Sequence, residues 1–282
     1  MKHFKLFKSS LIALALASST ASVAESFAIT NATVHTVTEQ GVLENATVVV
    51  ENGKVIAINP EILTADTIID AEGKILTPGF IGAMNQLGLV EVGAVSRSRD
   101  AGDKKADITF DASLAFNPRS TVIPYSRKGG ITSNVVAPRG GDDMFKGQTF
   151  FTDLSGEFDS VRSSHNNVVI DLGSQSKGSR ALALQNLQVK LEDAVKALAK
   201  NKDKTKDAKD KKDKKDAKEP SREAQVMNAL LTGDKALVAY ADRATDLLAL
   251  LKIKAEFSLD LVLVGAADAV LIASEISKAK VP

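Results

Sequence analysis

Residues 48–82 read VVVENGKVIAINPEILTADTIIDAEGKILTPGFIG, and this stretch determines how the N-terminal part of the chain is built. The dipeptide Asn52-Gly53 separates two β-branched runs, which is the strongest short-range signal for a β-hairpin. A second turn signal, Glu72-Gly73, separates two further short apolar runs. Together with the alternating pattern at residues 27–37, these signals predict a small all-β unit over residues 26–75.

The rest of the chain alternates between strand and helix patterns. Apolar runs typical of buried strands cover residues 131–137 and 168–170, and apolar residues at helical spacing cover residues 181–198. Strand, helix, strand and helix patterns then follow in turn at residues 236–240, 244–257, 261–264 and 266–278. This alternation predicts a parallel sheet with right-handed crossovers, and the fold class is therefore α/β.

The composition of the 282-residue chain excludes several classes of site. The chain has no Cys, which excludes disulfides, cysteine-zinc sites and iron–sulfur clusters. It has only three His, which leaves few ligands for a metal site built from histidine. It has no Trp and two Tyr, which argues against base-stacking platforms and hence against a nucleic-acid partner. Hydrophobic residues make up 44% of the chain, as in a globular protein.

Residues 1–24 have the order of a secretory signal peptide. Lys2, Lys5 and Lys8 precede a short apolar run, and small residues follow up to Ala24. The apolar run is shorter than the roughly 20 residues that a transmembrane helix needs. We therefore expect cleavage after Ala24, secretion across the inner membrane to a periplasmic location, and no transmembrane segment.

Residues 199–223 form a low-complexity insert that is rich in Lys and Asp. The insert contains ten Lys and one Arg against five Asp and two Glu, a net charge of +4. Since it offers no apolar face beyond Ala, it cannot fold onto a core. It is interpreted as a solvated linker or helix extension, and adhesion to an anionic lipid or polymer is the alternative.

Several stretches carry a resemblance to a known family, and residues 140–141, 146–148 and 261–267 contribute to it beside the three described next. Residues 48–82 resemble the N-terminal module of the amidohydrolase superfamily and its entry into the first barrel strand. Residues 129–138, GGITSNVVAP, resemble its second strand, and residues 233–247, GDKALVAYADRATDL, resemble a motif of its imidazolonepropionase-like branch. The resemblance implies a small N-terminal β-sandwich module at residues 25–75 and a (β/α)8 TIM-like barrel at residues 76–282.

The resemblance also implies a chemistry, which this sequence departs from. The family hydrolyses C–N or ester bonds with zinc or another divalent metal bound largely by His. Met84 and Gln86 stand where the resemblance puts the first two His, Tyr240 and Asp242 stand at the next two, and Val264 stands at a fifth. A thioether and an amide do not replace imidazole on zinc, so no metal cofactor is expected. The candidate pocket at these positions consists of Met84, Asn85, Gln86, Tyr240, Asp242 and Arg243.

Three functional interpretations follow from the sequence. The first is an exported pseudoenzyme on an amidohydrolase frame, without metal, which binds a small polar ligand or a partner. The second is an active amidohydrolase or dipeptidase-like hydrolase, in which Asp242 and other carboxylates hold a harder cation such as Mg²⁺ or Mn²⁺. The third is a fragment without function.

The barrel is expected to be incomplete. Residues 76–282 are fewer than the roughly 250 that a closed eight-stranded α/β barrel takes, and residues 199–223 are an insert. An open barrel exposes an unpaired parallel edge. We therefore expect a truncated version of a longer protein, whose edge is covered by self-association or by an active amidohydrolase-like partner.

Overall fold

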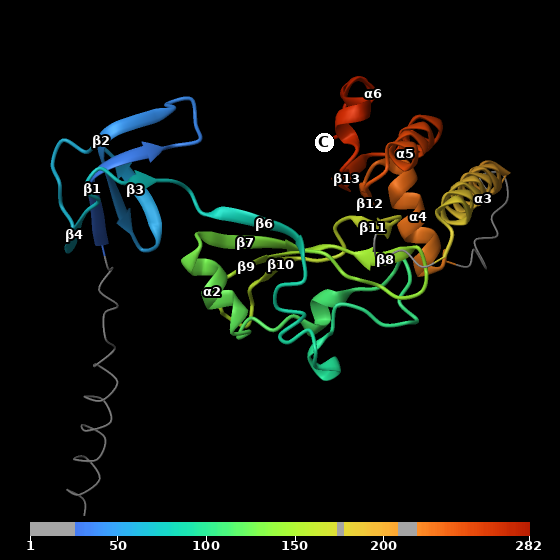
Figure 1. Ribbon diagram of the computed structural model, residues 1–282, viewed down its shortest axis with the longest axis horizontal. Helices are drawn as coiled ribbons and strands as arrows, with labels where there is room; N and C mark the ends of the chain where they lie inside the picture. The colour runs from blue at the N-terminus through green and yellow to red at the C-terminus, as the bar shows by residue number, and fades with distance from the viewer. Residues whose placement is uncertain (1–25, 174–177, 208–218) are drawn as a thin grey trace, which may run out of the picture. The chain divides into compact units, whose positions relative to one another are not determined.

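A computed structural model describes residues 26–173, 178–207 and 219–282 of the chain. The chain forms two compact units that divide between Pro78 and Gly79 (Figure 1). The predicted signal peptide and the middle of the charged insert lie outside the described residues. Within the insert, residues 199–207 continue a helix and Arg222 begins the next one.

The first unit contains one five-stranded sheet. Its strands are β1 (Ser26–His35), β2 (Val42–Glu51), β3 (Lys54–Ile58), β4 (Thr67–Asp70) and β5 (Ile75–Leu76). The order is β3-β2-β1-β4, and β5 also pairs with β1. Asn52 and Gly53 both have positive φ, 53° and 71°, so the predicted hairpin between β2 and β3 is confirmed with a type I′ turn. The sheet confirms the all-β prediction, whereas a sandwich stays a prediction.

The second unit begins with a four-stranded sheet in the order β10-β9-β7-β6. Its strands are β6 (Phe80–Asn85), β7 (Ile131–Val136), β9 (Phe150–Asp153) and β10 (Val161–Ser163). β6 and β7 are parallel, and helix α2 (Val122–Lys128) leads into β7. β9 and β10 were not predicted, because strands of three or four residues carry too short a pattern to be recognised.

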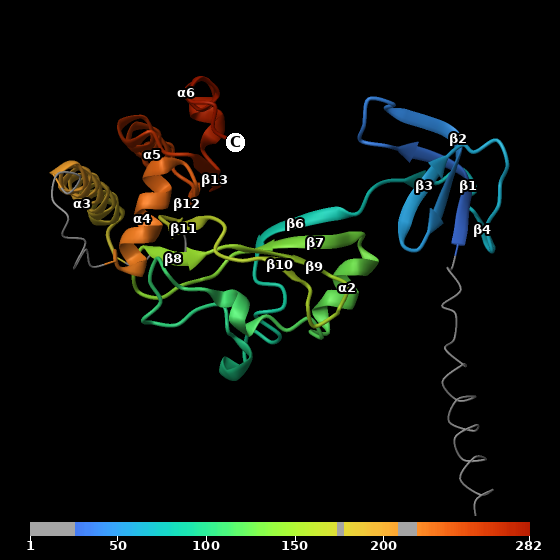
Figure 2. The ribbon, with the colours of Figure 1, turned by 180° about the vertical axis from the view of Figure 1, so that it is seen from behind.

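A second four-stranded sheet contains most of the core of this unit, in the order β13-β12-β11-β8. Its strands are β8 (Phe145–Gln148), β11 (Val168–Asp171), β12 (Leu237–Ala241) and β13 (Leu261–Gly265). β11, β12 and β13 are parallel, as predicted, and β8 is antiparallel to β11. Helices α3 (Arg180–Asp207), α4 (Arg222–Thr232) and α5 (Ala244–Phe257) lie beside this sheet and share its apolar core (Figure 2).

One predicted helix is wrong in its extent. The pattern at residues 266–278 predicted a continuous helix, but the structure has a 3-10 helix, η3 (Ala269–Ile272), and a short α6 (Ala273–Lys278). Ala266 has φ of 48°, outside the helical region, and the Asp268 carboxylate accepts a hydrogen bond from the Ala244 N–H at 3.1 Å. The contact between Asp268 and the start of α5 therefore takes the place of the first turn of the helix that was predicted from residue 266.

An apolar cluster joins the parallel strands of the two sheets. Ala137 after β7, Val169 on β11 and Val238 on β12 are buried together. Met84, Tyr240, Val262 and Val264 pack against them from β6, β12 and β13. This cluster therefore forms a shared apolar layer beneath the carboxyl ends of these strands, and we call it the apolar floor. The unit is α/β as predicted, and its closure into a partial barrel stays a prediction.

Candidate functional site

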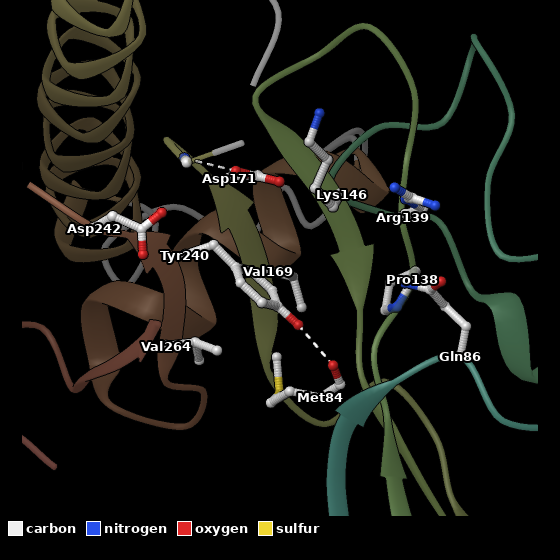
Figure 3. Close-up of a pocket in the computed structure, with 11 residues that line it drawn as sticks. Met84, Gln86, Pro138, Arg139, Lys146, Val169, Asp171, Tyr240, Asp242 and Val264 are labelled. Atoms are coloured by element: carbon white, nitrogen blue, oxygen red, sulfur yellow. Dashed lines mark hydrogen bonds between the residues drawn. The ribbon is translucent and has the colours of Figure 1, made fainter. Parts of the chain in front are cut away.

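A cavity of about 270 Å³ opens where the parallel strands end (Figure 3). Side chains from β6, β8, β11, β12 and β13 and from the loop after β7 surround it. The lining residues are Met84, Gln86, Pro138, Arg139, Lys146, Val169, Asp171, Gly173, Tyr240, Asp242 and Val264. The carboxyl ends of strands are where α/β proteins gather their binding sites, so this cavity is the candidate site.

Four of the six predicted site residues line this cavity: Met84, Gln86, Tyr240 and Asp242. Asn85 does not, because successive side chains along a strand point to opposite faces. Its amide instead pairs with Asn134, with both hydrogen bonds at 2.8 Å. Arg243 does not line the cavity either: it is exposed at the N-cap of α5, one residue beyond Asp242. Asn85 and Arg243 therefore lie outside the lining of this cavity, although both were predicted to belong to it.

Tyr240 crosses the floor of the cavity. Its hydroxyl donates a hydrogen bond to the Met84 carbonyl oxygen at 2.9 Å, as Figure 3 shows. Met84 has φ of 56°, and the ladder between β6 and β7 shifts register between Ala83 and Asn85. The Met84 carbonyl is thus presented by an irregular strand end, and Tyr240 supplies its partner. Burial, with a contribution from the charge of Asp171, raises the pKa of the Tyr240 hydroxyl.

Asp171 ends β11 and is 7% exposed. Its Oδ1 accepts a hydrogen bond from the Gly173 N–H at 2.7 Å. Burial raises the pKa of this carboxyl, and the neighbouring Asp242 adds to the rise. The Gly173 hydrogen bond and the charges of Lys146 and Arg139 act in the opposite direction without cancelling it.

Lys146 provides a fixed positive charge beside Asp171. The side chain is on β8 and is 4% exposed. Its Nζ donates to the carbonyl oxygens of Gly141 at 3.0 Å and of Asp143 at 2.8 Å. The ammonium group is therefore held by backbone groups of the loop before β8. Neither Lys146 nor Asp171 was predicted from the sequence, because β8 and β11 have four residues each, all of them buried and without an alternating pattern.

Asp242 sits between two glycines at the exposed rim of the cavity. A Cβ added at Gly265 would lie 2.7 Å from its Oδ1, and a Cβ added at Gly173 would lie 3.4 Å from its Oδ2. The same Gly173 position is 3.4 Å from Oδ1 of Asp171. The two carboxylates therefore face a common point, and glycine keeps that point open.

The residues around the cavity do not fit a divalent metal site. Within residues 26–173, 178–207 and 219–282, no group of three or more His, Cys, Asp or Glu side chains converges. The cavity has two carboxylates, with a lysine and an arginine among its lining residues. His35 belongs to β1, and His165 lies 3.3 Å from Asp111 in a different part of the second unit. A thioether, a phenol engaged with a carbonyl and a valine occupy three of the positions where the resemblance puts His.

Comparison with known proteins identifies the fold. No protein-family model matches the chain, and no curated protein sequence matches it significantly. The structure is similar to that of an amidohydrolase from Thermotoga maritima MSB8, with a TM-score of 0.74 and 24% sequence identity. The alignment covers 91% of this chain and 68% of that one. The chain therefore shares the fold of that amidohydrolase, which is the fold that the sequence resemblance indicated.

Two further structures show weaker likeness. A prolidase complexed with N-methylphosphonate-L-proline has a TM-score of 0.39 and 12% identity over 89% of this chain. A triazine hydrolase variant has a TM-score of 0.30 and 15% identity over 90% of this chain. The chain spans 64% and 58% of their respective lengths, which is less than two thirds. In the described residues, no helix is both long enough and apolar enough to cross a membrane.

Proposed function

We propose that this chain is a binding protein built on the amidohydrolase fold, in which metal-dependent hydrolysis has been lost. The observation that carries the proposal is the hydrogen bond from Tyr240 to the Met84 carbonyl. This bond links two of the positions at which the resemblance implies metal ligands. Both residues pack against the buried apolar cluster of Ala137, Val169 and Val238, so their side chains contribute to packing. The fold and the cavity are retained, while the donor atoms that a metal needs are replaced by packing groups.

The ligand that suits this cavity is small and polar. A volume of about 270 Å³ is near the lower end of ligand pockets, which hold drug-sized molecules at roughly 300–1,000 Å³. The wall carries Asp171 and Asp242 as well as Lys146 and Arg139, so both signs of charge are available. The amide of Gln86 adds a donor and an acceptor. A molecule of amino-acid size with charged or strongly polar ends matches this wall.

Binding is tested with two neighbouring variants. A panel of small polar compounds is screened by thermal shift on the wild-type chain, and hits are measured by calorimetry. Asp242→Asn removes a cavity charge, whereas Arg243→Gln changes an exposed charge one residue away that does not line the cavity. We expect Asp242→Asn to weaken the affinity for a hit about tenfold and Arg243→Gln to leave it unchanged. Equal affinities in all three proteins contradict binding in this cavity.

The competing function is a hydrolase with a carboxylate-held cation. It is favoured by the common point that Asp171 and Asp242 face. The assay is a panel of amides, dipeptides and lactones with added Mg²⁺, Mn²⁺ or Zn²⁺, together with metal analysis of the dialysed protein. We expect no stoichiometric metal and no turnover above the rate without protein. Metal-stimulated turnover that Asp242→Ala abolishes would overturn the proposal and establish the hydrolase.

Export and self-association are also part of the proposed function. The signal-peptide pattern of residues 1–24 supports a periplasmic location, which fractionation of tagged cells tests. Self-association is supported by exposed apolar residues on η3, which follows the edge strand β13 in the chain: Val270 is 80% exposed and Leu271 is 72% exposed. Analytical ultracentrifugation of the wild-type chain and of Leu271→Glu tests this. A monomer at all concentrations contradicts it.

A further inference from the structure

A second cavity, of about 330 Å³, lies at the opposite ends of the same parallel strands. His165 precedes β11 by three residues and Lys235 precedes β12 by two. Gln148 ends the antiparallel strand β8, beside Val168 at the start of β11. This cavity is therefore at the amino ends of the strands, and the candidate site above is at their carboxyl ends. The lining residues are Thr109, Gln148, His165, Arg222, Gln225, Val226 and Lys235.

The side-chain carbonyl oxygen of Gln148 is buried at this cavity without a hydrogen-bond partner. The residue is 2% exposed, and Oε1 is enclosed without a hydrogen bond to any described group. An unsatisfied buried polar group costs about 1–3 kcal/mol, so proteins rarely retain one without a use. A bound molecule in the adjoining cavity would give this amide the partner that the chain does not provide.

The two side chains of permanent charge that line the cavity are both positive. Arg222 and Lys235 both line it, and no carboxylate of the described residues does. The Lys235 ammonium group donates to the backbone carbonyls of His165 and Asn166. These two bonds hold it in place and leave one of its three donors for a ligand. Burial lowers the pKa of Lys235 while Asp234 raises it, as expected for an ammonium group partly withdrawn from water.

The first turn of α4 forms one wall. Ser221 caps the helix by accepting a hydrogen bond from the Ala224 N–H at 3.2 Å. The Gln225 amide donates to the Pro220 carbonyl oxygen at 2.9 Å, so this turn is fixed on both sides. Arg222 is its first residue. The helix has 11 residues, and the positive end of its dipole favours an anion at this wall.

The opposite wall is a loop with a fixed histidine. Nε2 of His165 lies 3.3 Å from Oδ2 of Asp111, and Nδ1 lies 3.0 Å from the Ser164 hydroxyl oxygen. Asp111 also accepts a hydrogen bond from the Ser113 N–H at 3.0 Å, so it is anchored as the cap of η2 (Ala112–Ala115). The imidazole is therefore held at the edge of the cavity by neighbours on both of its nitrogens.

We propose that this cavity binds a small organic oxyanion. The anionic group, a carboxylate or a phosphate, would lie between Arg222 and Lys235 at the start of α4. A hydroxyl or amide elsewhere on the same molecule would bond to the amide of Gln148. This site is separate from the cavity at the carboxyl ends of the strands, and it does not depend on whether that cavity binds a ligand or a metal.

The test compares three anions on the whole chain at constant ionic strength. Glycerol 3-phosphate carries a phosphate and hydroxyls, glycerate carries a carboxylate and hydroxyls, and inorganic phosphate carries no further group. Thermal shift and calorimetry are run on the wild type, Arg222→Gln, Gln148→Leu and the control Arg97→Gln. Arg97 is an exposed arginine of η1 (Ser96–Ser98) that does not line the cavity.

We expect at least one hydroxylated anion to bind better than inorganic phosphate in the wild type and in Arg97→Gln. Arg222→Gln should weaken all binding about tenfold, the effect of losing one charge-assisted hydrogen bond. Gln148→Leu should remove the advantage of the hydroxylated anion and, without ligand, raise Tm. Several results would overturn the proposal: no binding up to about 10 mM, equal binding by Arg222→Gln and the wild type, or a lower Tm for ligand-free Gln148→Leu.

Discussion

Replacing Tyr240 with Phe tests whether the hydrogen bond across the cavity floor holds the second unit together. The change removes the hydroxyl that donates to the Met84 carbonyl at 2.9 Å and leaves the ring in the apolar cluster. A hydrogen bond between neutral groups contributes a net 0.5–1.5 kcal/mol or so, and leaving a carbonyl partly buried without a partner costs about 1–3 kcal/mol. Since Met84 lies at a break in the strand ladder, we place the loss at about 1–2 kcal/mol.

The loss can be read directly from thermal unfolding. For a unit of 150–250 residues, 1 kcal/mol corresponds to roughly 2–4 °C in Tm, so Tyr240→Phe should lower Tm by about 2–8 °C. The measurement is calorimetry of both proteins without ligand. Tyr125→Phe is the matched control, because Tyr125, the only other tyrosine, is on α2 and is 75% exposed. We expect the control to change stability by less than about 0.5 kcal/mol. If the two variants have the same Tm, the bond from Tyr240 is not structural and the reasoning fails.

Three other changes probe the same cavity. In a Tyr125→Phe background, tyrosinate absorbance reports the Tyr240 hydroxyl alone, and this hydroxyl should titrate above the ordinary pKa of 10.0. Adding Asp171→Asn should lower the midpoint of the titration, because the charge of Asp171 contributes to the raised pKa. A midpoint at or below 10.0 in the Tyr125→Phe protein would contradict the effect of burial. The pKa of Asp171 is raised on folding, so its contribution to stability is fully present below pH 3.8 and declines as pH rises through the folded pKa. Asp171→Asn should therefore gain stability relative to the wild type between about pH 3.5 and pH 7 in denaturant titrations, and a constant difference would refute the raised pKa. Gly265→Ala should lower the free energy of unfolding by about 1–2 kcal/mol, because φ at this position is +84° and the new Cβ would lie 2.7 Å from Oδ1 of Asp242. An unchanged midpoint of chemical denaturation would show that the end of strand β13 relaxes to accommodate the new methyl group.

The fold was predictable wherever local signals and tertiary structure agree. Asn52-Gly53 adopts the positive φ values that a tight hairpin requires, and these come from the two residues themselves. Helix α5 begins at Ala244 and ends at Phe257, as its spacing predicted, because its apolar stripe faces the core. The prediction of a continuous helix after Gly265 was wrong because a tertiary contact overrides the local pattern there. Asp268 bonds to the start of α5, and that contact is invisible in a local pattern.

The site was predictable only for residues on strands of known direction. Met84 and Gln86 alternate with Asn85, so the first two share the cavity while Asn85 turns to Asn134. Lys146 and Asp171 could not have been found in the same way. Their strands are short and buried throughout, and only the pairing of β8 with β11 brings the two residues together.

The side chains at the strand ends that border the cavity find their partners within the chain. A buried polar group is stabilising only when it is satisfied, so each polar group at these strand ends needs a hydrogen-bond partner. Here Val264 contributes packing, and Tyr240 contributes packing together with a donor for the Met84 carbonyl. Two charged groups of the cavity wall, Asp171 and Lys146, are held by a backbone N–H and by backbone carbonyls. This wall therefore has positioned charges of both signs facing a cavity. If the cavity binds a ligand as proposed, the effects of Tyr240→Phe and Asp242→Asn are separable: the first should change stability and the second should change affinity.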